Sequence, residues 1–326
     1  MKSSPPNPYE SPREASESPR VLPAEIWRAR LLVLVAAIFW SMSGVLAKAP
    51  DFAEWRVHPA GGPAMAFWRA LFASLVLLPM VRRPQWSWKL VPMSLTFAVM
   101  NYVYLTAMAK GSAANAIWLQ NTGPMIVLLV GVLIFREPSR GLDWLMAALS
   151  SAGIALILYF EYMQAGGQNS FDAVLFGLSS GVTYAGVVLS LRMLRDFESA
   201  WLVALNHVVT AIALAPWGLA PLWNPDLAFL WPQGRQWVFL AALGILQMGL
   251  PYLLFAHALR KLPGHEASGI GLLEPLLVPI WVCAVWGWSE NFPAWWTIAG
   301  GGLIFAGLVI RYLGSAGEKQ ETKQAG

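Results

Sequence analysis

The sequence predicts an all-α integral membrane protein with ten transmembrane helices. Of its 326 residues, 57% are hydrophobic and only 12% are charged, whereas soluble domains carry roughly 25% charge. The mean hydropathy is +0.52, and the apolar runs reach the length of about 20 residues that a helix needs to cross a bilayer. Lipid cannot satisfy exposed backbone groups, so the runs must be helices or barrel strands, and they lack the alternation of barrel strands.

Ten apolar runs follow one another, separated by clusters of charged and turn residues. Their expected bounds are 31–49, 63–81, 90–109, 114–135, 142–160, 171–191, 199–219, 236–258, 266–288 and 293–313. We divide them into two five-helix units, 29–161 and 171–314. Residues 1–28 are rich in Pro, Ser and Glu and lack the apolar core of a signal peptide, so we expect a disordered tail there, with a second tail at 315–326.

The distribution of positive charge predicts the topology. Seventeen Lys and Arg residues fall on the side of the termini and four on the other side, with Arg69 left inside the second run. By the positive-inside rule, both termini are cytoplasmic in a multi-pass plasma-membrane protein. The net charge of +4 therefore reflects topology, and we expect the lipid bilayer, not nucleic acid, as the partner of this surface.

Short matching segments indicate an internal repeat. WSMSGVLAK at 40–48 matches YAGVVLSLR at 184–192, and FWRALFASLVLLP at 67–79 parallels LNHVVTAIALAP at 205–216. The fourth and ninth runs each carry a proline followed by a glutamate. Two units with an odd number of spans enter the membrane in opposite senses, which is the inverted-repeat architecture of secondary transporters.

The two proline segments carry a resemblance to a known family. QNTGPMIVLLVGVLIFREP at 120–138 and LLEPLLVPIWVCAVWGWSE at 272–290 are similar to the ends of the two repeats in EamA-type members of the drug/metabolite transporter superfamily. The second copy has two extra residues between its proline and its glutamate. The resemblance implies a cavity lined by spans 1, 3, 4, 6, 8 and 9, with spans 5 and 10 peripheral. Export is favoured over import only by this resemblance.

Three prolines inside apolar runs predict broken helices. Pro124, Pro251 and Pro275 each remove a backbone N–H and free the carbonyl four residues earlier. Unpaired carbonyls are tolerated at membrane depth where they face protein, water or a ligand. We therefore expect these helices to border a wet cavity.

Two charged residues lie within the runs. Glu274 is expected near the midplane, where a charge costs roughly 2.5 to 3.5 kcal/mol on insertion scales. It either binds a cationic substrate group, carries a coupling proton, or is a structural carboxyl that bonds to another helix. Arg69 could clamp a substrate carboxylate, but its position near a helix end favours a side chain that snorkels to the interface.

Polar and aromatic residues on the same runs complete the expected cavity. For any one of them, ordinary contact between helices is the commoner role, and the prediction concerns the set. Its members are Trp40, Asn101, Tyr104, Gln120, Tyr184, Gln247 and Tyr252.

The sequence contains none of the short motifs of common enzymes, such as HExxH, CxxC, a phosphate loop or GxSxG. We expect no cofactor and no metal site. The favoured function is secondary transport of a small polar metabolite, an amino acid or related solute, by alternating access. An integral-membrane enzyme and a non-transporting scaffold or receptor are the alternatives. Transport direction, coupling to protons and assembly into a homodimer stay open.

Overall fold

A computed structural model describes residues 23–324, except 165–167, 195, 260 and 263. Within this part of the chain, ten helical segments are long and apolar enough to cross a membrane, which confirms the predicted helical bundle. We number them spans 1 to 10 in chain order. Several are built from two helices that follow each other with a short break.

Spans 1 to 5 form the first half of the bundle. They are α1 (Pro23–Ser41) with α2 (Ser43–Ala47), α4 (Gly61–Leu77), α5 (Leu90–Lys110), α6 (Ala113–Gln120) with α7 (Gly123–Leu133), and α8 (Gly141–Gln164). Spans 6 to 10 form the second half. They are α9 (Gln168–Met193), α10 (Ser199–Gly218), α11 (Gln236–Gly244) with α12 (Leu250–Ala258), α13 (Gly264–Gly271) with α14 (Leu273–Trp286), and α16 (Trp295–Gln324).

Short helical turns occupy the connections. They are η1 (Pro50–Phe52), α3 (Ala53–Val57), η2 (Leu78–Met80), η3 (Ala220–Leu222), η4 (Pro225–Leu230) and α15 (Trp288–Asn291), and a π-helical turn, η5 (Ile245–Gly249), joins α11 to α12.

The two ends of the chain differ from expectation. Helix α1 begins at Pro23, so residues 23–28, which we assigned to a disordered tail, are helical; proline is well suited to a first helical position because its missing N–H would have no partner there. Residues 1–22 of that tail lie outside the described part. Helix α16 continues past the expected end of span 10 to Gln324.

Contacts between spans follow an internal two-fold relation. Span 1 packs on span 8 as span 6 packs on span 3, while spans 2 and 7, 4 and 9, and 5 and 10 contact each other. Exchanging every span with the one five positions along the chain leaves these pairings unchanged. Since each half has five spans, the halves cross the membrane in opposite senses, and the inverted repeat is confirmed.

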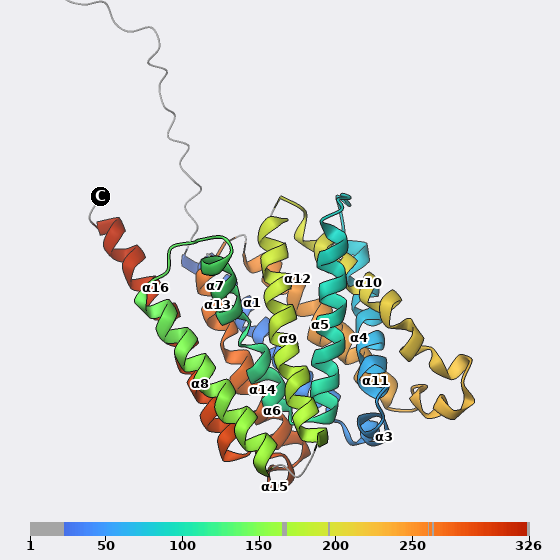
Figure 1. Ribbon diagram of the computed structural model, residues 1–326. Helices are drawn as coiled ribbons and strands as arrows, with labels where there is room; N and C mark the ends of the chain where they lie inside the picture. The colour runs from blue at the N-terminus through green and yellow to red at the C-terminus, as the bar shows by residue number, and fades with distance from the viewer. Residues whose placement is uncertain (1–22, 165–167, 195, 260, 263, 325–326) are drawn as a thin grey trace, which may run out of the picture.

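The bundle has two end faces. Helix α1 begins and α16 ends on one of them, at the top of Figure 1, and α3 and α15 lie at the other. We call these the proximal and the distal face. With ten spans, both ends of the described chain fall on the proximal face.

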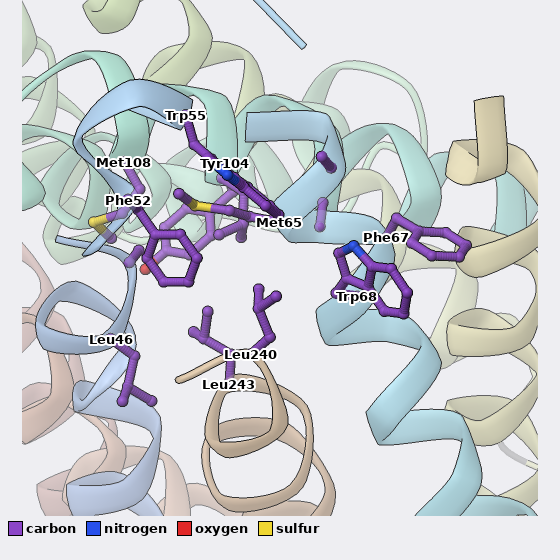
Figure 2. Packing of buried hydrophobic residues seen from close by; sticks show 14 of the residues in the cluster. Leu46, Phe52, Trp55, Met65, Phe67, Trp68, Tyr104, Met108, Leu240 and Leu243 are labelled. Carbon is purple, nitrogen blue, oxygen red and sulfur yellow. The ribbon is translucent and has the colours of Figure 1, made fainter. Parts of the chain in front are cut away.

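The largest apolar core lies in the distal half of the bundle and joins both halves (Figure 2). It includes Phe52 and Trp55, which are fully buried, together with Met65, Met108 and Leu240. The other buried clusters in the described chain are smaller and each involves fewer spans. The distal end is therefore closed by a shared core.

Spans 5 and 10 pack backbone against backbone. A Cβ on Gly153 would lie 2.4 Å from the carbonyl oxygen of Gly300, and a Cβ on Gly300 would lie 2.7 Å from that of Gly153. Real Cβ atoms essentially never come so close to backbone, so only glycine fits at either position. The contact is reciprocal, as the two-fold relation requires.

Candidate functional site

Helix interruptions lie next to the three prolines. Pro124 is the second residue of α7 and Pro275 the third residue of α14, each just after a break in its span. Pro251 is the second residue of α12 and follows the π-helical turn Ile245–Gly249. The structure thus places a change of helix geometry at each proline that removes a backbone donor.

Span 1 is also interrupted, at Met42 between α1 and α2, and the sequence reading missed this break because no proline accompanies it. The available signal was Ser41-Met42-Ser43-Gly44. A Cβ on Gly44 would lie 2.8 Å from Val282 and 2.9 Å from Val278. The break therefore lets span 1 approach span 9 closely.

Glu274 lies in the first turn of α14. The positive end of a helix dipole stabilises a carboxylate at this position, so the break in span 9 supplies one favourable interaction for Glu274. The Glu274 side chain is half-buried.

Four side chains from both halves lie near Glu274. The charge of Glu274 acts on one residue from each of spans 2, 3, 6 and 8, namely Arg69, Tyr104, Tyr184 and Tyr252. We call Arg69, Tyr104, Tyr184, Tyr252 and Glu274 the central polar cluster. The sequence named all five, but it could not show that they converge.

Arg69 does not snorkel, contrary to the interpretation favoured from its position. The residue is 2% exposed, and its Nε and Nη1 have no hydrogen-bond partner in the described chain. Its guanidinium carbon lies 5.7 Å from the centre of the Tyr104 ring, within range of a cation–π contact. The described residues form no ion pair between Arg69 and Glu274, so two opposite charges face the same region without touching.

Further contacts attach Ser43 and two predicted residues, Trp40 and Gln247, to this region. The Tyr104 hydroxyl and Ser43 Oγ are 3.0 Å apart, and the Trp40 ring packs edge-on against Tyr252 with centres 5.4 Å apart. Gln247 Nε2 donates to the carbonyl of Trp40 at 3.2 Å, while its Oε1 is buried without a partner.

Asn101 and Gln120 are not joined to the cluster by the contacts of the described chain. Asn101 is 1% exposed and its Nδ2 donates to the carbonyl of Phe97 on its own helix. Gln120 ends α6 and is half-buried. The prediction that they line the cavity stays a prediction.

His207 is a residue that the sequence reading undervalued. It is fully buried in α10, neither ring nitrogen has a partner among the described residues, and its ring meets Phe97 at 5.0 Å. The charge of Arg69 acts on it. An ionisable side chain inside a membrane span was the available signal.

Part of the cluster is not closely covered by the described residues. Tyr184 is 38% exposed although its charge interactions are with Tyr252 and Glu274, deep between the helices. A Cβ on Gly271, three residues before Glu274, would meet nothing within 4 Å. Tyr104, by contrast, belongs to the buried distal core. The open side of the cluster is thus the side away from that core.

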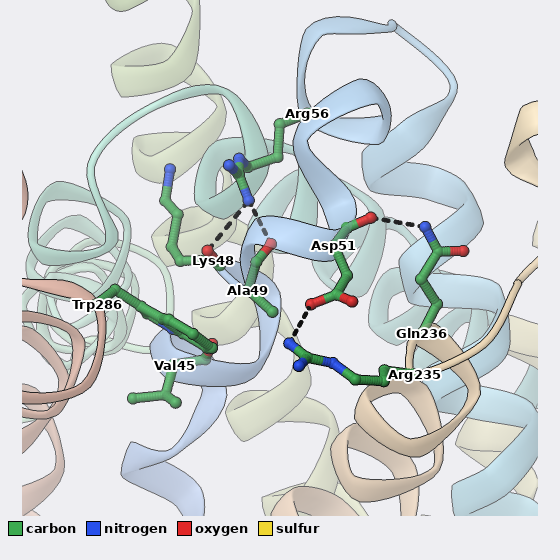
Figure 3. A network of polar contacts seen from close by, with 8 residues as sticks. All are labelled: Val45, Lys48, Ala49, Asp51, Arg56, Arg235, Gln236 and Trp286. Carbon is green, nitrogen blue, oxygen red and sulfur yellow. Dashed lines mark hydrogen bonds and ion pairs between the residues drawn. The ribbon is translucent and has the colours of Figure 1, made fainter.

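A polar network ties the two halves together at the distal face (Figure 3). Arg235, just before span 8, forms an ion pair with Asp51 at 2.9 Å, and Gln236 at the start of span 8 donates to the Asp51 carbonyl. Trp286 of span 9 donates to the carbonyl of Val45 at 2.8 Å. Arg56 donates to the carbonyls of Lys48 and Ala49. Segment 45–56 of the first half is therefore fixed to the second half.

Lys48 at the end of span 1 caps the end of α5. Its Nζ donates to the carbonyls of Ala109 and Gly111, where the negative end of a helix dipole attracts a cation. Burial, and then the charge of Arg56, lowers the pKa of Lys48 to about 7. Burial also lowers the pKa of Arg56.

Comparison with known proteins identifies the family. The model of the EamA-like transporter family matches residues 27–159 and 172–313, one segment for each half. The chain belongs to the EamA-like transporter family. This EamA-family chain is 23% identical over 267 residues to an uncharacterized transporter of Archaeoglobus fulgidus, covering 78% of this chain and 89% of that protein.

A second relative agrees with the assignment, and a solved structure shares the fold. The uncharacterized transporter YxxF of Bacillus subtilis is 23% identical over 232 residues, which is 70% of this chain and 71% of that protein. One crystal structure matches 87% of this chain and 96% of its own at a TM-score of 0.55 and 18% identity, which shows the fold alone. The EamA-family protein is a multi-pass membrane transporter.

Proposed function

We propose that this transporter carries a small zwitterionic solute of the amino-acid class and binds it at the central polar cluster. The observation that supports this most is the pairing of Arg69 with Glu274. The two opposite charges face one region deep in the bundle and do not neutralise each other directly. A solute with one carboxylate and one ammonium group satisfies both.

The energetics favour this class of solute. A buried, unpartnered guanidinium is costly unless something pairs with it, and Arg69 Nε and Nη1 lack partners among the described residues. Arginine binds carboxylates in a two-pronged geometry, and a carboxylate is the natural acceptor for an ammonium group. A phosphate ester would require more than the one arginine that faces this region.

The rings in and around the cluster suit an organic solute of modest size. Trp40, Tyr184 and Tyr252 offer flat apolar surface with polar edges, and ligand sites are commonly apolar with a few placed polar groups. Their positions on three different spans mean that movement of either half changes the shape of the site.

The two-fold relation of the halves supports alternating access as the mechanism. The described conformation has the distal end closed by the shared core and by the network around Asp51. Opening that end must break the Arg235–Asp51 and Trp286–Val45 contacts while the proximal end closes. Glu274 is our candidate for a group that releases a proton when the solute binds.

The test is uptake by proteoliposomes with a panel of labelled neutral amino acids, monocarboxylates, primary amines and sugar phosphates. We expect transport of at least one neutral amino acid and none of the sugar phosphates. Tight binding or transport of sugar phosphates in place of zwitterions would contradict the proposed substrate class.

Matched variants locate the site. Arg69→Gln and Glu274→Gln are each expected to reduce uptake at least tenfold, because each removes one of the two charge pairs. Arg83→Gln and Glu54→Gln change the same charges at exposed positions and are expected to transport normally. Full activity of both Arg69→Gln and Glu274→Gln would remove the cluster from the mechanism.

A further inference from the structure

A second carboxylate is buried near the distal face, away from the central polar cluster. Glu161, at the end of span 5, is 8% exposed. Its Oε1 accepts hydrogen bonds from Asn115 Nδ2 at 2.6 Å and from Trp296 Nε1 at 3.2 Å. Thr297 Oγ1 donates to Asn115 Oδ1 at 2.8 Å, so spans 4 and 10 hold the carboxyl group in a fixed orientation.

The second oxygen of this carboxyl group is not engaged by the part of the chain that the structure describes. Glu161 Oε2 accepts no hydrogen bond from the described residues, and no described cation forms an ion pair with it. Buried carboxylates are ordinarily paired or fully hydrogen-bonded, because an unsatisfied one is costly. Both hydrogen bonds converge on one oxygen and leave the other available.

The two lysines that line cavities together with Glu161, Lys48 and Lys110, are engaged elsewhere. Lys48 Nζ donates to the carbonyls of Ala109 and Gly111, and the Lys110 ammonium lies 5.9 Å from the centre of the Phe176 ring. Neither supplies the positive charge that Glu161 lacks.

Glu161 opens onto two small cavities. The larger, of about 300 Å³, is also lined by Lys48, Ser112, Glu290, Asn291 and Thr297. The smaller, of about 210 Å³, lies on the other side of the start of α6. The larger volume is at the lower end of the range for ligand sites, and its wall has two carboxylates against one lysine that is already bonded.

We propose that the larger cavity binds a small organic ammonium ion whose N–H groups donate to Glu161 Oε2. A primary ammonium group fits because it brings the missing charge and three donors, while its short organic part fits the remaining volume. A coordinated metal ion fits less well, since the described residues contain no group of three His, Cys, Asp or Glu side chains placed to hold one. The site does not depend on the proposed substrate of the central cluster.

The experiment measures binding in a protein whose central carboxylate has been removed. Full-length Glu274→Gln protein in an uncharged detergent is titrated with ethylammonium chloride, followed by calorimetry and by the melting temperature. Sodium chloride at matched ionic strength is the comparison. We expect saturable binding and a rise in melting temperature with ethylammonium, and no saturable effect of sodium. Equal stabilisation by both salts would overturn the proposal.

Adding Glu161→Gln to this protein removes the charge but keeps an oxygen that can accept from Asn115 and Trp296. Ethylammonium should then bind at least tenfold more weakly, whereas adding Glu54→Gln, at an exposed position on the same face, should change nothing. Unchanged affinity in the Glu161→Gln protein would refute the site.

If Glu161→Gln fails to fold, a variant that fills the cavity tests the proposed site instead. Ala294 lines the larger cavity and is half-buried, so Ala294→Leu fills part of that space without altering any charge. Ethylammonium affinity should fall in the Ala294→Leu protein. Retained affinity there would place the ion outside this cavity and reject the assignment.

Discussion

At the scale of single residues, Arg69 is costly to bury and is also the proposed partner of a substrate carboxylate. Its guanidinium is buried with two nitrogens unpartnered and with a tyrosine ring as its nearest favourable contact. Groups that function in binding are often kept at the expense of stability. A single substitution of Arg69 should therefore change stability and transport in opposite directions.

Arg69→Met is expected to stabilise the protein while it abolishes transport. Replacing buried charged groups by apolar ones of similar volume is often neutral or stabilising by about 1–4 kcal/mol, which corresponds to a rise of a few degrees in melting temperature. Thermal unfolding in detergent and proteoliposome uptake measure the two effects. A lower melting temperature would mean that the guanidinium is fully satisfied in the folded protein.

Lys48 gives a prediction about pH. Its pKa is lowered to about 7 in the folded protein, whereas an exposed lysine titrates near 10.4. The folded state therefore binds this proton less tightly than the unfolded state, and the contribution to stability is fully present above the unfolded pKa. It is lost as the pH falls from about 10 to about 7.

The corresponding experiment compares the wild type with Lys48→Met. The melting temperature of the wild type should rise between pH 7 and pH 10 relative to that of Lys48→Met, which lacks the titrating group. Parallel pH profiles of the two proteins would show that the Lys48 ammonium keeps its ordinary affinity for protons.

At the scale of helices, close packing against the broken span 4 depends on Gly181. A Cβ there would lie 2.6 Å from the carbonyl oxygen of Leu119 and 2.5 Å from Thr122 Oγ1, beside the break between α6 and α7. The missing side chain thus lets span 6 support the interrupted segment from which the cavity is built.

Gly181→Ala is expected to destabilise the protein by about 1–3 kcal/mol, the usual cost of overpacking a core. Gly302→Ala is the matched control, because a Cβ on Gly302 would meet nothing within 4 Å. Alanine at such a helical position should stabilise by about 0.5–1 kcal/mol. The melting temperatures of the two variants should therefore shift in opposite directions, and a shift in the same direction would contradict this account.

The sequence alone predicted most features of the helices, but not all of them. Length and hydropathy sufficed for ten spans, and the chemistry of proline placed the interruptions in spans 4, 8 and 9. The break at Met42 has no proline to mark it, and the close approach of Gly44 to Val278 and Val282 beside it comes from a span distant in sequence. Burial of Arg69 was missed because the sequence placed it near a helix end, whereas it lies in the middle of α4, Gly61–Leu77.

For the candidate site, too, the sequence predicted residue types but not the contacts between distant spans. The sequence selected Glu274, Tyr104, Tyr184 and Tyr252 as polar or aromatic groups in apolar runs. Their convergence depends on spans that are distant in sequence, and the role of Glu161 depends on donors from Asn115 and Trp296 in two other spans. Neither relation has a signature in local sequence.

At the scale of the whole molecule, the distribution of charge and the ten spans together make topology testable. Single cysteines placed in a Cys283→Ala background should fall into two classes with a membrane-impermeant thiol reagent. Gln85→Cys and Pro138→Cys lie on the proximal face, and Glu54→Cys and Ser289→Cys on the distal face.

In intact cells, only the distal cysteines should react, because the positive-inside rule places the proximal face in the cytoplasm. Permeabilised cells, in which all four should react, provide the control for exposure. Reaction of one proximal and one distal cysteine in intact cells would be incompatible with the inverted repeat described above.

The mutual fit of Gly153 and Gly300 constrains how the molecule can move. Spans 5 and 10 come from opposite halves, yet their backbones touch and leave no room for a side chain. Pulling the halves apart along this seam would expose main chain that nothing else covers. Under the proposed alternating access, we therefore expect spans 5 and 10 to stay together while the distal and proximal ends of the bundle open and close in turn.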